Sequence, residues 1–186
     1  MNSPRFTITT VARLVDEKNL FFALQVMKAI KEDQEYDFRY HIIGDGPLRE
    51  AITKAIDQFN LSHHVKLFGA LRHRDVRQQL AETDLFLLPS GYEASPVCVL
   101  EAQAMGIPVV ATCVGGLDEA VQDGRTGYLI PLNDVQEAKF RIDFLHGNSD
   151  LRQQMGAQGR KFVEDNFDIR KITKRLVDIY EAQLAN

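Results

Sequence analysis

The sequence predicts a single α/β domain built on a doubly wound parallel sheet, which is a Rossmann-like fold. Short apolar runs alternate with longer amphipathic ones from Phe6 to Pro131, as expected for repeated strand–helix units. The runs Leu85–Leu88 and Val109–Ala111 are apolar at every position. Such runs are typical of parallel strands buried on both faces. The 186 residues, 45% of them hydrophobic, are enough for one domain with a full-size core.

The individual elements are predicted from local signals. Phe22, Val26 and Ile30 lie four apart and define one face of the first helix. Pro47 suits the first turn of the second helix, and Gly106 suits the residue that closes a later one. The predicted strands are Phe6–Val11, Phe38–Ile43, Val65–Phe68, Asp84–Pro89, Ile107–Thr112 and Gly127–Pro131. The predicted helices are Asn19–Lys31, Leu48–Phe59, Asp75–Ala81 and Val97–Met105, followed by Asp134–His146, Ser149–Asp165 and Asp168–Ala185.

Composition and charge exclude several classes of protein. The formal net charge is −4, whereas a general nucleic-acid binder needs a basic face that displaces counterions. The longest apolar runs are too short to span a bilayer, and Met1–Pro4 lacks the charged and apolar regions of a signal peptide. Cys98 and Cys113 each lie in an apolar stretch and are interpreted as reduced core cysteines. These features favour a cytoplasmic protein that does not bind nucleic acid.

No metal site and no cofactor are predicted. The five histidines are scattered, and none forms a pair with metal-ligand spacing. The sequence also has no Asp-x-Asp, the usual carboxylate pair for holding a divalent ion on a nucleotide diphosphate. We therefore expect the charge of a bound nucleotide to be met by Arg, Lys and helix dipoles.

The site is expected at one edge of the sheet. In doubly wound folds, ligands bind beyond the carboxyl ends of the strands, at the point where the strand order reverses. The loops that follow the predicted strands there are Ala12–Lys18, Gly44–Pro47, Gly69–Arg74, Ser90–Pro96 and Cys113–Leu117.

The strongest signal lies around the start of the helix after the fourth strand. Glu93 precedes this helix, Pro96 begins it, and Glu101 lies one turn inside. N–H groups near Pro96 are free to face an anion, which the helix dipole also favours. Glu101 shares a face with Val97 and is expected at the edge of the buried face, where a carboxylate needs hydrogen bonds such as those from ribose hydroxyls. The alternative is that Glu93 caps a turn and Glu101 is solvated.

Two cations form the second signal. Arg13 and Lys18 lie five residues apart in the first strand–helix loop. The planar guanidinium of Arg grips a diphosphate with two parallel hydrogen bonds, and Lys adds a point charge. The alternative is a pair of solvated loop cations.

Glycines at two other loops are interpreted as turns. Gly44 and Gly46 begin a pattern like the dinucleotide fingerprint, but Arg49 stands where its third glycine is required. A tight strand-to-helix turn is therefore favoured. Gly115 and Gly116 also favour a turn, although they would let the backbone approach a ligand closely.

Taken together, these pieces resemble the C-terminal domain of the retaining GT-B glycosyltransferases of family four. The resemblance runs from about Val11 to Phe167. Each motif is weak by itself, but seven in the right order are highly specific. They are Val11–Lys18, Ile42–Leu48, Val65–Gly69, Asp84–Ser90, Glu93–Thr112, Val114–Glu119 and Asp123–Ile130.

The resemblance implies a role for each candidate residue. Arg13 and Lys18 would neutralise the diphosphate of a UDP-, GDP- or ADP-sugar donor, and Glu101 would hold its ribose. Glu93 would reach the transferred sugar, so that Glu93, Arg13 and Lys18 form the catalytic set. Backbone amides between the two glutamates would hold sugar hydroxyls or phosphate, at Ala94, Ser95, Pro96 and Val97. The loop after the third strand would lie against the base and comprises Gly69, Ala70, Leu71 and Arg72.

The resemblance also implies two parts of the chain and an absent partner domain. Residues 1–167 would bind the nucleotide sugar. Residues 168–186 would form a C-terminal helix that crosses back to an N-terminal domain, which binds a saccharide or lipid-linked acceptor. Met1–Pro4 is interpreted as an artificial start or a truncation. The whole enzyme would be a metal-independent retaining hexosyltransferase of polysaccharide or glycolipid synthesis, with peripheral contact at the inner face of a membrane, and this fragment would be inactive alone.

Three residues depart from the pattern that is resembled. Ala12, Asn19 and Ala94 stand where glycine is usual. The added methyl group of Ala94 narrows the space where backbone meets sugar, which bears on the pose of the sugar and not on the class of enzyme.

Two other functions remain as alternatives. A dinucleotide-binding dehydrogenase shares the fold class, but the third glycine and a suitably placed acidic residue after the first strand are lacking. A non-catalytic nucleotide-binding module would be favoured by loss of Glu93, Glu101, Arg13 or Lys18, and all four are present.

Overall fold

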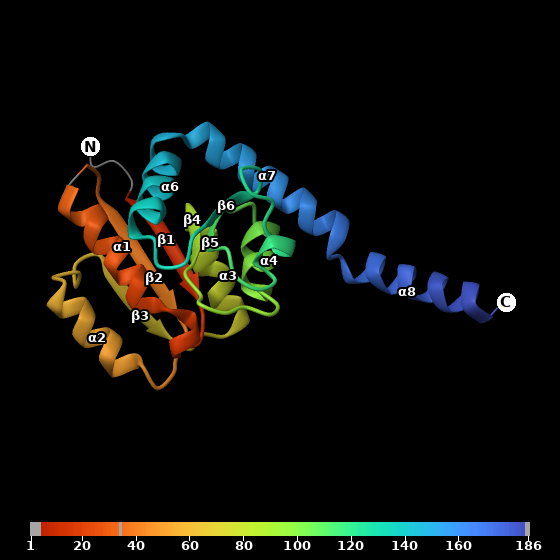
Figure 1. Ribbon diagram of the computed structural model, residues 1–186, viewed down its shortest axis with the longest axis horizontal. Helices are drawn as coiled ribbons and strands as arrows, with labels where there is room; N and C mark the ends of the chain where they lie inside the picture. Colours follow the sequence, from red (N-terminus) through yellow and green to blue (C-terminus); the bar gives the residue numbers. More distant parts are fainter. Residues whose placement is uncertain (1–4, 34, 185–186) are drawn as a thin grey trace.

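The computed structural model describes residues 5–33 and 35–184, so Met1–Pro4, Gln34, Ala185 and Asn186 lie outside the described residues. Six strands form one parallel sheet in the order β3-β2-β1-β4-β5-β6 (Figure 1). The strands are β1 Phe6–Val11, β2 Phe38–Ile43, β3 Val65–Gly69, β4 Leu85–Leu88, β5 Val109–Thr112 and β6 Gly127–Ile130. This order is the doubly wound one, and its direction reverses between β1 and β4.

Helices cover both faces of the sheet. One apolar core joins strand residues to α1, α2 and α6, and a second joins them to α3, α4 and α5. The helices are α1 Leu20–Asp33, α2 Arg49–Gln58, α3 His73–Ala81, α4 Val97–Ala104, α5 Leu117–Ala120, α6 Val135–Gly147, α7 Ser149–Asn166 and α8 Ile169–Leu184, with a 3₁₀ turn η1 at Asp16–Lys18. The predicted doubly wound, Rossmann-like fold is confirmed.

The central strands are buried on both faces, as their uniform apolarity predicts. In β4, Leu85 and Leu87 face the core under α1, whereas Phe86 and Leu88 face the core under α4. All four side chains have no exposed surface. Neighbouring β1 pairs with β4 in parallel through Ile8 and Leu85. Alternation between two cores is what a parallel strand with helices on both sides requires.

The predicted elements differ from the observed ones mainly at their ends. The fifth strand begins at Val109 and not at Ile107, because the intervening Pro108 has no N–H to donate to a ladder. The second helix begins at Arg49, two residues beyond Pro47. The 3₁₀ turn η1 and the four-residue α5 were not predicted, since elements of one turn leave no periodicity in the sequence.

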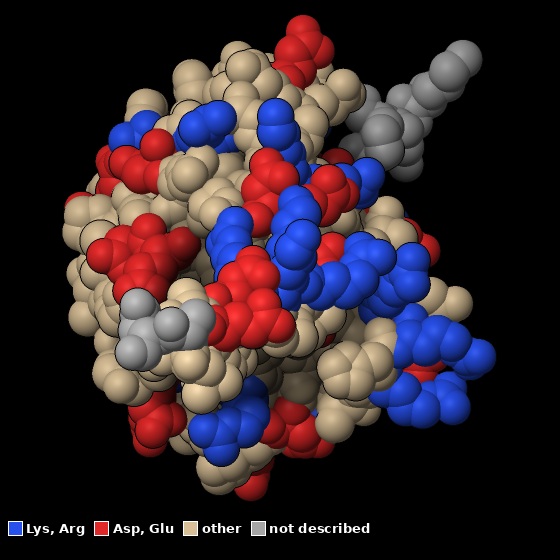
Figure 2. Space-filling view, turned by 90° about the vertical axis from the view of Figure 1, so that its right-hand side faces the viewer, with Lys and Arg blue, Asp and Glu red and all other residues tan. Residues whose placement is uncertain are grey.

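The last helix projects from the body of the molecule (Figure 1). None of the residues of α8 is buried. Its apolar stripe is therefore uncovered and comprises Ile169, Ile172, Leu176, Val177, Ile179, Tyr180 and Leu184. Seen from the side toward which α8 points, Lys and Arg side chains gather beside Asp and Glu side chains (Figure 2). Across residues 5–33 and 35–184, no helix is long and apolar enough to cross a membrane.

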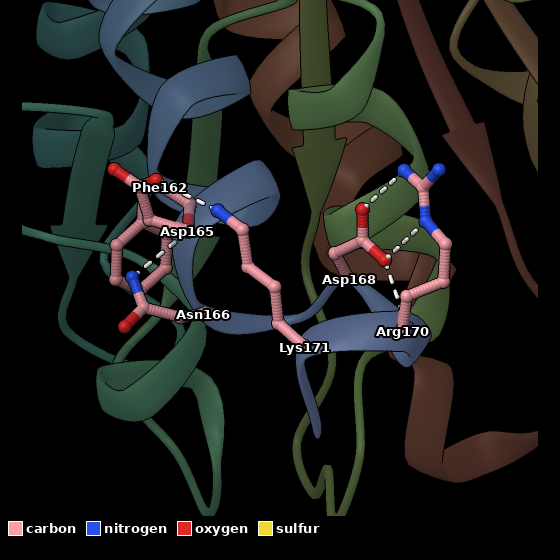
Figure 3. Close-up of polar contacts among 6 residues, drawn as sticks. All are labelled: Phe162, Asp165, Asn166, Asp168, Arg170 and Lys171. Carbon is pink, nitrogen blue, oxygen red and sulfur yellow. Dashed lines mark hydrogen bonds and ion pairs between the residues drawn. The ribbon is translucent and has the colours of Figure 1, made fainter. Parts of the chain in front are cut away.

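Polar contacts fix the joint between α7 and α8 (Figure 3). The Asp168 carboxylate accepts hydrogen bonds from the backbone N–H of Arg170 at 2.9 Å and from its guanidinium at 2.7 Å. The guanidinium and the N–H of Arg170 hold the pKa of Asp168 at about 2. Lys171 donates to Asp165 at 3.1 Å across the joint. The start of α8 is thus defined by charge and capping rather than by burial.

Candidate functional site

The strand order brings the first and fourth loops together. Because β1 and β4 are neighbours, the loops that follow them meet at the edge of the sheet where its winding reverses. Gly91 donates its N–H to the carbonyl oxygen of Glu17 at 2.8 Å, which joins the two loops directly. The candidate site is therefore at the place that the fold class predicts.

Backbone hydrogen bonds connect the loops in the order of the strands. The Gly44 N–H donates to Gly69 at 2.9 Å, which ties the loop of β2 to that of β3. Leu14 donates to Asp45 at 3.0 Å, which ties the loop of β1 to that of β2. On the other side, Gly116 donates to Glu93 at 2.9 Å and ties the loop of β5 to that of β4. Five loops thus form one continuous edge.

Glycines make this edge possible by permitting close backbone contact. Gly44 has φ of 138°, and a Cβ there would lie 1.9 Å from the carbonyl oxygen of Ala12. Gly115 has φ of 53°, and a Cβ there would lie 1.9 Å from the carbonyl oxygen of Glu93. Both distances are impossible for a side chain. The interpretation of these glycines as turn residues is correct, and their neighbours are the loops that carry the candidate residues.

The first loop presents one exposed and one partly buried cation. Arg13 is exposed, and the buried Leu14 beside it anchors the loop. Lys18 ends the 3₁₀ turn, and Asn19 follows with φ of 48°. The side-chain amide of Asn19 donates to that of Asn133, in the loop before α6, at 2.9 Å.

Lys18 and Glu93 form an ion pair across the two loops. The Lys18 ammonium donates to the Glu93 carboxylate with Nζ 2.5 Å from Oε2. Only 18% of the Lys18 side chain and 9% of the Glu93 side chain are exposed. The two residues are 75 positions apart in the chain. Two of the sequence-predicted catalytic residues are therefore in direct contact.

The start of α4 is open to solvent beside this pair. Ala94 and Ser95 are exposed, and within the described part of the chain their N–H groups have no acceptor. Val97, in contrast, donates its N–H to Ser95 at 3.0 Å, and Pro96 has none. Of the four amide positions expected to face a ligand, two are available. Val97 is 56% exposed, whereas Glu101 is intermediate in burial, in line with its expected place at the edge of the buried face.

Glu101 lines a groove between α3 and α4. Its side chain is 41% exposed, and Oε1 is 3.9 Å from Nδ1 of His73. The groove has a volume of about 370 Å³. It is lined by His73, Val76, Arg77, Leu80, Glu101, Ala104 and Met105.

The loop after β3 borders the same region. Gly69 has φ of 74° and is followed by the exposed Ala70 and the partly buried Leu71. Arg72 is the N-cap residue of α3, and its guanidinium donates to Asp75 at 2.9 Å. This hydrogen bond lowers the pKa of the Asp75 carboxyl. Because His73 follows this loop, its residues lie next to the groove that contains Glu101.

The sequence of the chain matches a known family. Residues 1–162 match the family model described as glycosyl transferases group 1. The chain belongs to this family. The colanic acid biosynthesis glycosyltransferase WcaL of Escherichia coli K12, a putative assignment, is 34% identical over 182 residues, which are 94% of this chain and 45% of that protein.

A second relative supports the same family, and a solved structure shows the same fold. The amylovoran biosynthesis glycosyltransferase AmsK of Erwinia amylovora is 33% identical over 94% of this chain and 44% of that protein. The crystal structure of HepE from Anabaena in complex with UDP superposes with a TM-score of 0.87 at 21% identity, over 96% of this chain and 49% of that one. The chain thus spans less than half the length of the relatives that it matches.

One departure from the glycosyltransferase pattern, Asn19, has a structural explanation, whereas nothing in the structure explains Ala94. Asn19 stands where glycine is usual and adopts the left-handed conformation, which asparagine tolerates better than most side chains. Ala94 lies beside Gly116, whose Cβ would be 2.7 Å from the Ala94 carbonyl oxygen. The backbone of this transferase loop is therefore confined from the side of β5.

The interpretation of both cysteines as core residues is half wrong. Cys98 is partly buried on α4, and burial together with the Glu93 carboxylate raises the pKa of its thiol to about 12. Cys113 is exposed, because it follows β5 in the loop at the open edge of the sheet.

Sequence reasoning also left some site features unrecognised. Neither the Glu17 carbonyl that holds Gly91 nor the approach of His73 to Glu101 was expected. The first depends on β1 and β4 being neighbours, and the second on α3 and α4 packing over the same face of the sheet. The described residues contain no group of three or more His, Cys, Asp or Glu side chains arranged to hold a metal ion.

Proposed function

We propose that this chain is the donor-binding half of a retaining glycosyltransferase, which transfers a sugar from a nucleoside diphosphate sugar to a saccharide or lipid-linked acceptor. The observation that carries the proposal is the Lys18–Glu93 ion pair, set between two loops at the reversal point of the sheet. It places a cation for phosphate and a carboxylate for hydroxyl groups side by side. WcaL and AmsK, named for polysaccharide synthesis, support this class, as does the UDP in the HepE structure.

The nucleotide is held by charge and by hydrogen bonds to its ribose. Arg13 and Lys18 neutralise the diphosphate, and the free N–H groups of Ala94 and Ser95 add dipoles at the start of α4. Glu101 accepts hydrogen bonds from the two ribose hydroxyls. The base lies against Gly69, Ala70, Leu71 and Arg72.

The chemical step depends on stabilising the leaving group. The acceptor oxygen attacks the anomeric carbon from the face that the diphosphate leaves, so that configuration is retained. The bond from the anomeric carbon to the phosphate oxygen breaks, and that oxygen helps to take the acceptor proton. Arg13 and Lys18 stabilise the negative charge that develops, while Glu93 orients the transferred sugar through its hydroxyl groups. These two cations make a divalent metal unnecessary in this proposal.

The acceptor is bound by a partner domain outside this chain. The apolar stripe of α8 fits that arrangement, because an uncovered strip of this kind normally lies against another surface. Residues 168–186 then pack on the acceptor-binding domain, and the fragment alone transfers no sugar. The whole enzyme acts in the cytoplasm, in peripheral contact with the inner face of the membrane.

A panel of nucleotides measured by calorimetry tests the proposal. UDP, GDP, ADP and NAD are titrated into the 186-residue chain, with and without EDTA. One of the three diphosphates is expected to bind, with an affinity that EDTA leaves unchanged, and Arg13→Ala is expected to weaken it. Preference for NAD supports a dehydrogenase domain instead. Absence of all binding contradicts the assigned site, and a large loss of affinity with EDTA contradicts its metal independence.

A further inference from the structure

The Lys18–Glu93 ion pair joins two groups that serve different parts of the donor. In the proposed function, Lys18 binds the diphosphate and Glu93 binds the sugar. In the structure Lys18 and Glu93 pair with each other, with Nζ 2.5 Å from Oε2. We propose that this ion pair makes the site favour the intact nucleotide sugar over the nucleoside diphosphate product. The inference rests on the proposed function and adds a selectivity to it.

The backbone of Glu93 is held from both sides. Gly91 donates to Glu17 at 2.8 Å, and Gly116 donates to Glu93 itself at 2.9 Å. Gly115 leaves no room for movement in that direction, because its α-carbon hydrogen already faces the Glu93 carbonyl oxygen. The backbone of Glu93 is therefore held in place when a ligand arrives, and its 9% exposed carboxylate has little open space to move into. Lys18, with four rotatable side-chain bonds, is the partner that moves.

A bare diphosphate draws Lys18 away and leaves Glu93 without a cation. With 9% of its side chain exposed, Glu93 gains little from water in compensation. Within residues 5–33 and 35–184, no second side chain donates to it. A buried carboxylate that loses its only charged partner is destabilised, and the nearby phosphate charge adds repulsion. Part of the affinity for the diphosphate is lost in this way.

An intact nucleotide sugar brings its own replacement for Lys18. Its sugar hydroxyls donate to Glu93 while its diphosphate takes the ammonium, so both ends of the broken ion pair regain a partner. After transfer, the sugar is gone and Glu93 competes again for Lys18. The same two residues thus weaken the hold on the product relative to the donor, which favours product release.

The experiment compares each bare diphosphate with its sugar form in the Glu93→Gln variant. UDP and UDP-glucose, GDP and GDP-mannose, and ADP and ADP-glucose are titrated by calorimetry. Glutamine keeps the shape and frees Lys18. The bare diphosphate is expected to bind about fivefold more tightly, the scale of one partly exposed ion pair. The sugar form is expected to bind no more tightly than to the unmodified chain, so the ratio of the two affinities falls.

Glu17→Gln is the matched control. It removes one negative charge from the same loop, but its side chain is exposed and forms no ion pair among the described residues, while its carbonyl group remains for Gly91. It is expected to leave the ratio unchanged. An equal effect of Glu17→Gln and Glu93→Gln overturns the proposal, because the cause is then general charge.

A double variant separates release of Lys18 from simple loss of repulsion. In a Lys18→Gln background, Glu93→Gln is expected to raise the affinity for the bare diphosphate by clearly less than fivefold, since repulsion is relieved but no lysine remains to be freed. A fivefold gain there overturns the proposal. If Glu93→Gln does not fold, as judged by circular dichroism, Glu93→Asp takes its place, because the shorter side chain lengthens the ion pair and should give a smaller gain. In the remaining outcome, a diphosphate binds the unmodified chain but no variant changes the ratio of its affinity to that of the sugar form. That result contradicts this inference and leaves the proposed function standing.

Discussion

The candidate site and helix α8 are held in opposite ways. At the site, five loops are joined by backbone hydrogen bonds, and glycines such as Gly44 and Gly115 allow contacts too close for any side chain. In α8 no residue is buried, and the polar contacts at Asp168 define only its start. The comparison teaches that the loops of the candidate site are organised by contacts within this chain, whereas α8 presents an uncovered apolar surface.

The largest expected effect comes from truncating an apolar residue in the body that carries the site, with an apolar residue of α8 truncated for comparison. Ile142→Ala removes a fully buried side chain of α6 and should lower the free energy of unfolding by about 2–5 kcal/mol. Leu176→Ala in α8 should change it by less than about 0.5 kcal/mol, because that side chain is already half exposed. Urea unfolding of both variants measures the difference. Equal effects would mean that α8 packs on the body in solution.

A methyl group at two glycines tests the confinement of the site. Gly115 and Gly124 both have positive φ, but a Cβ at Gly124 has no neighbour within 4 Å. Gly115→Ala should cost about 2–4 kcal/mol, since strain and overlap with Glu93 add up. Gly124→Ala should cost about 1 kcal/mol, from strain alone. Thermal unfolding gives both values, and only Gly115→Ala is expected also to impair nucleotide binding.

Loss of the Glu101 charge in the groove between α3 and α4 should lower the affinity for the nucleotide by an intermediate amount. Glu101→Gln is expected to reduce the affinity for the bare diphosphate about tenfold or more, because a hydrogen bond to a charged acceptor contributes about 1.5–3 kcal/mol. Glu119→Gln, on the exposed face of α5, is the control of equal charge. Calorimetry decides, and a larger loss from Glu93→Gln than from Glu101→Gln would reverse the two roles.

The smallest effect is expected from lowering the pH, which protonates Asp168 at the start of α8. The pKa of Asp168 is about 2 in the folded chain, below the ordinary value of a carboxyl group. Its contribution to the first turn of α8 is therefore present in full above that ordinary value and is lost as the pH falls toward 2. Amide exchange at Arg170 and Lys171 should speed up between pH 5 and pH 2.5, corrected for intrinsic rates, while that of Leu87 should not. Unchanged protection at Arg170 would contradict the capping role.

The fold could be predicted from the sequence because its signals are local and repeated. Runs such as Leu85–Leu88 specify strands with two buried faces, and residues four apart specify helices. One-turn elements such as Leu117–Ala120 leave no such signal. Observed boundaries differ from the predicted ones where a single residue limits the element, as Pro108 does before β5.

The site could be predicted as a set of residues but not as a set of contacts. Arg13, Lys18, Glu93 and Glu101 were singled out from motif and residue chemistry. Their spacing along the chain says nothing of the Lys18–Glu93 ion pair, which exists because β1 and β4 are neighbours. The exposure of Val97 was missed for a similar reason, since it depends on what covers the start of α4.

The side-chain bridge between Asn19 and Asn133 has a consequence for how this site varies between relatives. Both residues have positive φ, of 48° and 61°, where glycine relieves backbone strain. Glycine at position 19 would relax the end of the first loop but remove its hydrogen bond to the loop before α6. The two positions are therefore expected to change together across sequences. Glycine at position 19 or 133 is expected mainly in sequences where the other position is no longer asparagine.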